Sequence, residues 1–532
     1  MSQNASPFLR PVSGLVRSAG FWDVFIYNIG LISVGIGAIY TQRFGTAYYP
    51  NGDISAATLL SAAALLFVVL GFIAWTTAVP RSGGIYVFLS RAGFPGFGFA
   101  VSFVEAISWL FYVAIAAKLI VTGVLQPMAY IFLGGEASAT TFLSTNLGQF
   151  CVGSGLIGLG FLLLRRGTTL FLLVQRITFV LALVGTVALL LVLVSPSAQQ
   201  TFAKNFGVLL QLGGVANLSD LYSAAKAAGW VLQTAPATFE GSAALAVWPV
   251  LPLIGAAFSI AIGGEVRNSA KNQASGMLAS LVVAVIAFVL IAEFAAISIG
   301  NGAQGASAFL VDAKKLTLGG NSNLDPTIAL LSALATDSTF LRSLVFACFL
   351  AWIWFWVPGL LSYCQRVVLA WSLDRVAPAA LGNLHPRFGT PHSALLVVAL
   401  VAEVFLALII WTEYFGTLVF ILAGTIAWGL ALLFGAFFPF VRNALFLRTP
   451  LGLRAKFGKL FMVISCGLGA ASMALVVWML LRDSLATGDL WRGLITVAVT
   501  FAVGLILFQL SARNHRRSGL DINKAFDEIP VE

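Results

Sequence analysis

Long apolar stretches follow one another along almost the whole chain, and this feature limits the folds open to it. A helix of about 20 apolar residues crosses the roughly 30 Å hydrocarbon layer of a bilayer, because each residue adds about 1.5 Å. We count twelve such stretches between residues 21 and 510, and charged residues make up only 9% of the chain. The sequence therefore predicts an all-α, multi-pass membrane protein.

The first apolar stretch, Phe21–Thr41, contains residues that weaken a helix. They are three glycines and two polar residues: Asn28, Gly30, Ser33, Gly35 and Gly37. Glycine leaves the backbone uncovered, so we expect a break here, with the freed peptide groups satisfied by protein or by a wet cavity. Close helix packing around small residues is the alternative interpretation.

A second stretch, Ala246–Glu265, is interrupted by Pro249, Pro252 and Gly255. Proline has no N–H group, so the first half of this stretch cannot form a full ladder of helical hydrogen bonds. Gly35 and Gly255 are about 220 residues apart, close to half of a ten-helix core. Paired interrupted spans in two halves of a chain are typical of the midplane binding site of a secondary transporter.

The distribution of basic residues predicts the orientation in the membrane. Twelve spans place both termini on one side, and 21 of the 30 lysines and arginines fall on that side. The positive-inside rule then predicts a plasma-membrane protein with both termini cytoplasmic. Topology explains the net charge of +10 better than nucleic-acid binding does. The four cysteines are expected to be free, packed thiols: Cys151, Cys348, Cys364 and Cys466.

Several ionisable residues lie inside or near predicted spans. A carboxylate or ammonium in a bilayer costs several kcal/mol unless it is paired or wet, and buried carboxylates are the usual proton relays. Glu105, Lys118 and Glu293 are therefore candidate proton-coupling residues, and Glu403 is a weaker one. Glu105 and Lys118 are thirteen residues apart on one span, about 20 Å, so they do not form a simple pair. Asp23 and Glu265 lie near span ends, and we expect them to cap a helix end or to act as gating residues.

Three motifs follow predicted spans 2, 6 and 8. They are PRSGGIYVF (Pro80–Phe88), GGEVRNSAKN (Gly263–Asn272), and QRVVLAWSLDRVAP with HPRFGTP (Gln365–Pro378 and His385–Pro391). These motifs resemble signatures of the amino acid, polyamine and organocation (APC) transporter superfamily, over about residues 15 to 445. The resemblance implies a 5+5 inverted repeat of the leucine transporter type, with helices 1 and 6 unwound at mid-membrane and two peripheral helices.

On this basis we expect six segments. They are a cytoplasmic tail (1–20), transmembrane helices 1–5 (21–194), an extracellular loop (195–242), helices 6–10 (243–445), helices 11–12 (446–512) and a cytoplasmic tail (513–532). We also expect a turn-rich loop over Arg43–Ile54 and a short amphipathic helix just after Pro326.

The resemblance also implies where a substrate binds. The two halves of a split helix present amides and carbonyls with about half a charge each, and these match the carboxylate and ammonium of an amino acid. The carboxylate is assigned to the amides of Val34, Gly35, Ile36 and Gly37. The ammonium is assigned to carbonyls near Ile32, Ser33, Leu253, Ile254, Gly255 and Ala256. Phe258 is the nearest ring that could serve as a lid, and the absence of charged side chains around the two breaks favours neutral substrates.

Ion coupling is predicted to be sodium-independent. Sodium-coupled relatives place hydroxyl oxygens in the middle of span 8, but this chain has AWIWFWVPG there (Ala351–Gly359). Some sodium-independent relatives place a lysine in span 5, where this chain has Ala182. Proton coupling, uniport and exchange remain open.

Enzymatic classes find little support in the sequence. The three histidines, His385, His392 and His515, fall in cytoplasmic segments, and no GxxxxGK[ST] nucleotide motif occurs. We expect no catalytic residue, metal, cofactor, nucleic acid or obligatory protein partner. The predicted partners are an amino acid and the bilayer. Two alternatives stay open: the same fold moving another small solute (amine, polyamine or K⁺), and a sensor that does not transport.

Overall fold

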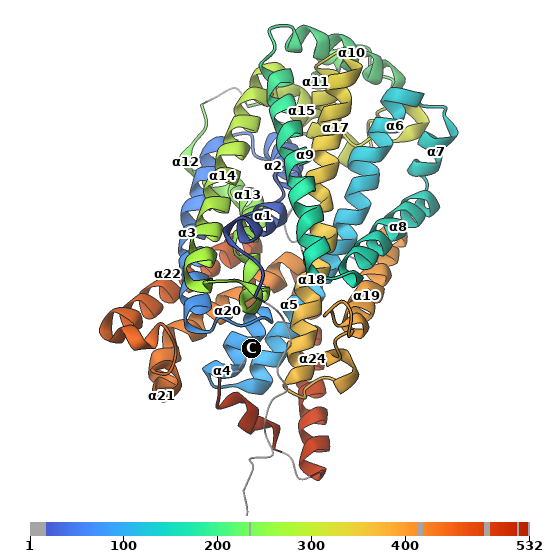
Figure 1. The fold of residues 1–532 in the computed structure, drawn as a ribbon. Helices are drawn as coiled ribbons and strands as arrows, with labels where there is room; N and C mark the ends of the chain where they lie inside the picture. Colours follow the sequence, from blue (N-terminus) through green and yellow to red (C-terminus); the bar gives the residue numbers. More distant parts are fainter. Residues whose placement is uncertain (1–16, 234–235, 413–418, 484–489, 519–520, 530–532) are drawn as a thin grey trace, which may run out of the picture.

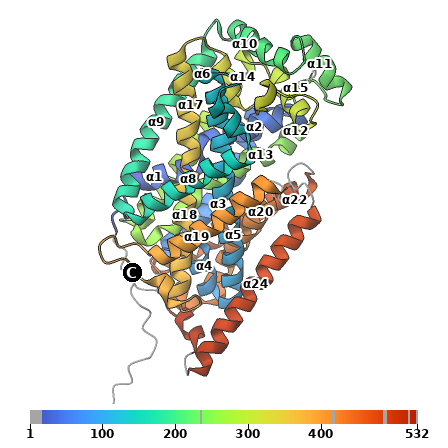
Figure 2. The same ribbon diagram turned by 90° about the vertical axis from the view of Figure 1, so that its right-hand side faces the viewer.

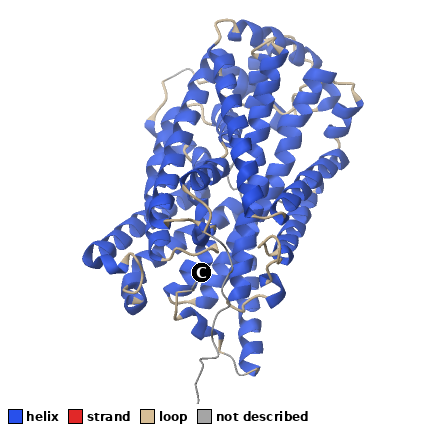
Figure 3. Cartoon of the chain, in the orientation of Figure 1, coloured by secondary structure: helices blue, strands red, loops and turns tan. Residues whose placement is uncertain are grey.

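The structure is a computed structural model, and it describes residues 17–233, 236–412, 419–483, 490–518 and 521–529. This described part of the chain is helical and contains no β-strand (Figure 3). Eleven of its helices are long and apolar enough to cross a membrane, and a pair bent by 41° makes a twelfth if it counts as one span. The all-α, multi-pass prediction is confirmed at this level.

Eleven α-helices form the chain up to residue 227. They are α1 (Phe21–Ile32), α2 (Val34–Tyr48), α3 (Ile54–Ala78), α4 (Gly84–Ala92), α5 (Pro95–Ile120), α6 (Gln126–Leu133), α7 (Ser138–Ser144), α8 (Asn146–Arg165), α9 (Thr168–Val194), α10 (Ala198–Leu212) and α11 (Leu218–Ala227). A π-helical turn, Val121–Leu125, joins α5 to α6, so this span continues to Leu133.

The remaining helices begin at residue 239. They are α12 (Phe239–Leu245), α13 (Val247–Leu253), the 3₁₀ helices η2 (Ile254–Ala261) and η3 (Gly263–Glu265), α14 (Ser269–Ser298), α15 (Asn301–Asp312), α16 (Ile328–Leu334), α17 (Thr339–Trp354), α18 (Trp356–Leu373), α19 (His392–Trp411), α20 (Val419–Val441), α21 (Asn443–Phe446), α22 (Ala455–Arg482) and α24 (Leu490–Arg517).

The first span lies at the centre of the bundle and the last one lies at its edge (Figures 1 and 2). The most apolar window of Phe21–Tyr48 is 94% buried, whereas that of Trp491–Arg517 is 11% buried. Helix α1 packs against α14, η2, α9 and α18, and α2 packs against α13, α15 and α17. Large apolar side chains along α9, α22 and α24 are exposed, which suits helices that face lipid.

The two ends of the bundle differ. Helices α10, α11 and α15 cover one end, whereas α4 lies at the other, near the C-terminal end of α24 (Figures 1 and 2). We refer to these as the α10 end and the α4 end. Helices α10 and α11, and the start of α12 at Phe239, fall in the segment predicted as a loop, so this segment is mostly helical.

Two further local predictions need correction. Helix α2 continues to Tyr48 through residues expected to be a loop. The helix after Pro326 exists, but it begins at Ile328, after a Thr327 cap, and all of its side chains are buried, so it is not amphipathic. Three of the free cysteines are buried as predicted, while Cys151 is exposed.

Candidate functional site

The first span is interrupted at one residue, Ser33. Helix α1 ends at Ile32 and α2 begins at Val34, while Ser33 lies in the left-handed region with φ 53°. A non-glycine residue is uncommon in this conformation and persists where its surroundings hold it. The Ser33 hydroxyl donates to the Trp352 carbonyl of α17 (2.7 Å), and it accepts a bond from the Ile36 amide (3.3 Å). The break is therefore fixed by a neighbouring helix.

The nearby glycines serve packing rather than the break itself. A Cβ built on Gly30 would lie 2.4 Å from the Phe355 ring, and one built on Gly37 would lie 1.9 Å from the Phe288 ring. A Cβ on Gly35 would lie 2.9 Å from the Trp352 side chain. The first span is interrupted where the sequence predicts, but the cause is different. Aromatic rings pack against the glycines, and the helix breaks at Ser33.

The second interruption is a change of helix type. Helix α13 ends at Leu253, and the 3₁₀ helix η2 continues to Ala261. Pro249 and Pro252 remove two amide donors from this stretch, which weakens the α-helical ladder at this point. Neither interrupted span is therefore a continuous α-helix, as the sequence predicts.

The two interruptions touch each other through their backbones. A Cβ on Gly255 would lie 2.4 Å from the Ile32 nitrogen and from the carbonyl carbon and oxygen of Leu31. Only a glycine fits such a contact. The predicted binding residues, Ile32–Gly37, Leu253–Ala256 and Phe258, are all buried. The structure thus brings them together in a closed arrangement.

Two amides at the start of α2 have no hydrogen-bond partner among the described residues. The break removes the helical acceptors of Val34 and Gly35, and no other acceptor bonds to either N–H group. The other two amides assigned to a substrate carboxylate are occupied, because Ile36 bonds to the Ser33 hydroxyl and Gly37 bonds to the Ser33 carbonyl at 2.9 Å. Buried free amides are rare in folded proteins, so Val34 and Gly35 mark the part of the break that can receive an anion.

A buried polar network surrounds the contact. The Asn28 side chain donates to the Ser259 hydroxyl (3.0 Å) and accepts from the Ser259 amide (2.8 Å). Ser259 also donates to Gln273, whose amide returns a bond to the Ser259 carbonyl at 2.9 Å. The Trp356 indole donates to the Leu31 carbonyl at 2.8 Å. Helices α1, η2, α14 and α18 are therefore joined around the interruptions.

Sequence reasoning missed three members of this network: Ser259, Gln273 and Trp356. Ser259 is the one hydroxyl residue between Leu253 and Ile262, and this isolated polar position is the signal that could have identified it. Gln273 and Trp356 had no comparable signal, since their partners are fixed by tertiary packing.

Glu105 lies in a box of aromatic side chains beside η2. Its Oε1 accepts bonds from the Tyr363 hydroxyl and from the Trp428 indole, the latter at 2.6 Å. Its Oε2 is buried and has no hydrogen-bond partner among the described residues, and the same holds for the Trp109 indole nitrogen. The Phe258 ring packs on Trp109, Tyr363 and Trp428 at centroid distances of 4.8, 5.2 and 5.2 Å. We call these five residues the Glu105 box.

The other predicted ionisable candidates lie elsewhere. Lys118 donates to the Ile409 carbonyl at 3.1 Å. Glu293 is exposed on α14 and accepts a bond from Ser55. Glu403 is half-buried and accepts from Ser154 at 2.6 Å. Among the described contacts of the three proton-coupling candidates, only those of Glu105 lead to the interrupted second helix, because its donors Tyr363 and Trp428 pack on Phe258.

Trp352 of α17 forms hydrogen bonds to Ser33 at the break and to Thr186 of α9. Its carbonyl accepts the Ser33 hydroxyl, and its indole donates to the Thr186 hydroxyl at 2.9 Å. Thr186 in turn donates to the Ala182 carbonyl at 2.8 Å. The hydroxyl groups nearest to the break are thus engaged with protein partners. Na⁺ needs several oxygen ligands, and the Ser33 and Thr186 hydroxyls would have to give up these partners to bind it.

Buried ion pairs link helices toward the α4 end. Arg366 of α18 binds Glu265 of η3 at 2.8 Å, and their side chains are 5% and 3% exposed. Arg91 of α4 pairs with Asp374 at 2.6 Å, fully buried. Asp23 accepts from Arg176 of α9 (2.6 Å) and from the Gly20 amide (3.0 Å). The geometry around Asp23 and Glu265 agrees with capping and interhelical roles.

The arrangement combines two interrupted helices in backbone contact, two free amides and one buried carboxyl group in an aromatic box. Neither a scan against protein-family models nor a search of curated proteins finds a match to this chain.

Proposed function

We propose that this chain is a secondary transporter or exchanger of amino acids with neutral side chains, in the APC superfamily. The observation that carries the proposal is the pair of unpartnered amides at Val34 and Gly35, beside the contact between the two interrupted helices. Free peptide groups inside a membrane bundle require a ligand, water or a change of conformation to be satisfied.

The peptide groups that the break leaves without a hydrogen-bond partner complement a zwitterion. The Val34 and Gly35 amides stand at the positive N-terminus of α2 and suit a carboxylate. The Ile32 carbonyl, at the negative end of α1, lost its helical donor because Ile36 bonds to Ser33 instead. This carbonyl and those of Leu253–Ala256 suit an ammonium group.

Alternating access requires the contact at Gly255 to open. In the present arrangement this contact leaves no room for even one added carbon atom, so a substrate enters only when η2 and α1 separate. The Asn28–Ser259–Gln273 bonds join the same elements and are candidates for the interactions that break or persist during the movement. Rocking of two bundles about a fixed site is the usual form of such a cycle.

Glu105 is the proposed proton-coupling residue. Its Oε1 has two neutral donors, its Oε2 has none, and no salt bridge to it is found among the described residues. Such a carboxyl group is most stable when it holds a proton, because a lone buried charge is costly. Its two hydrogen-bond donors, Tyr363 and Trp428, both pack on Phe258, three residues after Gly255, and this links protonation to the interrupted helix.

We place the protein in the plasma membrane, with the α4 end facing the cytoplasm. Arg81 lies just before α4 and Arg91 lies in its last turn, while Arg165 ends α8 and Arg166 caps it. This excess of basic residues supports cytoplasmic termini and an α10 end that faces outward.

A second candidate is transport of a cationic amine. The Glu105 box is a carboxyl group surrounded by aromatic rings, and such groups suit ammonium ions through charge and cation–π attraction. In this case Glu105 would contact the substrate itself.

Uptake into proteoliposomes tests both candidates. The purified chain is reconstituted, and labelled neutral amino acids, basic amino acids and polyamines are offered with and without an imposed pH gradient. The proposal expects saturable uptake of neutral amino acids. Uptake restricted to amines would favour the second candidate, and saturable binding without flux would indicate a sensor.

A further inference from the structure

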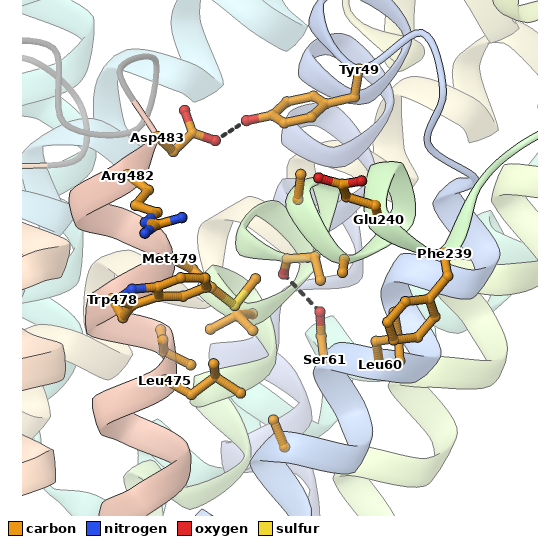
Figure 4. Close-up of a pocket in the computed structure, with 16 residues that line it drawn as sticks. Tyr49, Leu60, Ser61, Phe239, Glu240, Leu475, Trp478, Met479, Arg482 and Asp483 are labelled. Carbon is orange, nitrogen blue, oxygen red and sulfur yellow. Dashed lines mark hydrogen bonds between the residues drawn. The ribbon is translucent and has the colours of Figure 1, made fainter.

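A separate cavity of about 620 Å³ lies at the edge of the bundle, between α3, α12, α13 and α22 (Figure 4). It is distinct from the interrupted-helix contact, although α13 forms one wall. Its deeper walls are apolar and include Leu60, Ala64, Val250 and Leu475. Leu475 is 49% exposed, so this wall also faces the lipid side of α22.

The mouth of the cavity carries three charged residues, Glu240, Arg482 and Asp483, and Asp483 accepts a bond from the Tyr49 hydroxyl. Figure 4 shows Arg482 and Glu240 at the same level, across the opening from each other. Among the described residues, no salt-bridge partner within 4.0 Å is found for either. The Arg482 guanidinium stacks on the Trp478 ring at 4.5 Å, which holds it over the opening.

The depth of the cavity matches the outer part of a membrane leaflet. Arg482 is the last residue of α22, and Leu475 lies seven residues earlier, or about 10 Å deeper. Trp478 stands between them, and tryptophan is enriched at the boundary between headgroups and acyl chains. The mouth is closed at its upper side by the Tyr49 hydroxyl, which binds Asp483 and accepts from the Trp248 indole at 2.9 Å.

We infer that this cavity binds one phospholipid with a zwitterionic aminoethyl phosphate headgroup. Its phosphate lies at Arg482, its ammonium lies at Glu240, and one acyl chain occupies the apolar space beside Leu60 and Leu475. The charge pair at the mouth selects this headgroup over an anionic one, because only a headgroup with an ammonium gives Glu240 a partner of opposite charge.

The bound lipid has a structural consequence. Ala246 and Val250 of the α12–α13 pair line the cavity, and the Ala246 carbonyl accepts a bond from Ser61 of α3 at 2.7 Å. A ligand that binds this arrangement stabilises it by mass action. Lipid binding therefore favours the present position of α13.

Native mass spectrometry tests the inference. The full chain is extracted from nanodiscs that contain equal amounts of phosphatidylethanolamine and phosphatidylglycerol, and the retained lipid is identified. We expect one phosphatidylethanolamine per chain. Arg482→Gln should weaken retention about tenfold, because one charge-assisted contact is lost. Glu240→Gln should remove the preference between the two lipids, and Ala244→Phe should fill the cavity and abolish retention.

Controls separate the site from general lipid adhesion. Arg516→Gln changes an exposed arginine at the α4 end and should leave retention unchanged. Thermal unfolding of each variant shows that it is folded, and Arg482→Gln is an exposed substitution that should not disturb folding. Unchanged retention in both Arg482→Gln and Ala244→Phe would overturn the inference. A preference for phosphatidylglycerol, or equal binding of glycerophosphoethanolamine without acyl chains, would also overturn it.

Discussion

Gly255 of η2 lies directly against the peptide group that joins Leu31 to Ile32. A Cβ at Gly255 would be 2.4 Å from the Leu31 carbonyl oxygen, far inside van der Waals contact. At this point the two interrupted spans meet by main chain on both sides, so side-chain adjustment cannot relieve a substitution there.

Gly255→Ala should therefore separate the two spans. We expect the loss of stability typical of overpacking, about 1–3 kcal/mol, together with loss of substrate uptake. The change is measured as a lower melting temperature in detergent and as uptake in proteoliposomes. Gly467→Ala is the matched control, because a Cβ at this position in α22 meets no atom within 4 Å. Equal behaviour of the two variants would contradict the backbone contact.

Ser33→Ala and Ser33→Gly distinguish conformation from hydrogen bonding at the break. Both variants lose the 2.7 Å bond to the Trp352 carbonyl, but only alanine is strained at φ 53°. We expect Ser33→Ala to be less stable than Ser33→Gly by about 1 kcal/mol. Thermal unfolding of the two proteins provides the measurement. The order would reverse if the first span were a continuous helix, because alanine is the better helix former.

Glu105→Gln should uncouple transport from protons. Glutamine resembles the protonated carboxyl group, so we expect exchange of labelled for unlabelled substrate to continue while uptake driven by a pH gradient is lost. Glu403→Gln is the control, since this carboxylate is bonded to Ser154 on a peripheral pair of helices. Loss of exchange as well as uptake in Glu105→Gln would point to direct contact between Glu105 and an amine substrate.

Arg366→Met should strongly destabilise the protein. It leaves the Glu265 carboxylate buried without its partner, which typically costs about 3–5 kcal/mol. The double variant Arg366→Met/Glu265→Gln should recover part of this loss, and unfolding of the four proteins forms a double-mutant cycle. Lys204→Met serves for comparison, because the Lys204–Asp337 pair is 65% and 57% exposed and should contribute at most about 1 kcal/mol. Similar losses in the two single variants would exclude a special role for the buried pair.

Replacement of Na⁺ by choline should leave the uptake rate unchanged. The Ser33 hydroxyl is bonded to the Trp352 carbonyl and the Thr186 hydroxyl accepts from its indole, so neither hydroxyl is available as an ion ligand in this arrangement. Uptake is measured at constant pH and ionic strength in the two salts. A requirement for Na⁺ would show that Trp352 moves away from Ser33 during the cycle.

The sequence predicted the helical class and the location of both interruptions because glycine and proline act locally. Pro249 and Pro252 lack amide donors in any fold, so a defect near Gly255 followed directly. The break at Ser33 could not be assigned to its residue, because the partner that holds it, Trp352, is 319 residues away. The bounds of helix α10 could not be assigned for a related reason: its apolar face packs on other elements only in the fold.

The partners of Glu105 illustrate the same limit. The sequence identified an acidic residue within an apolar span, and its cost in a membrane made it a candidate. Tyr363 and Trp428 lie more than 250 residues after Glu105 in the chain, so the sequence around Glu105 gave no indication of the aromatic box. Burial of the residue was predictable, whereas its chemistry was not.

The single-residue break has a mechanical meaning. Only the two torsion angles of Ser33 separate α1 from α2, and the fifteen residues of α2 extend about 22 Å beyond that joint. The Trp352 carbonyl that accepts the Ser33 hydroxyl therefore sets the direction in which all fifteen residues of α2 leave the break.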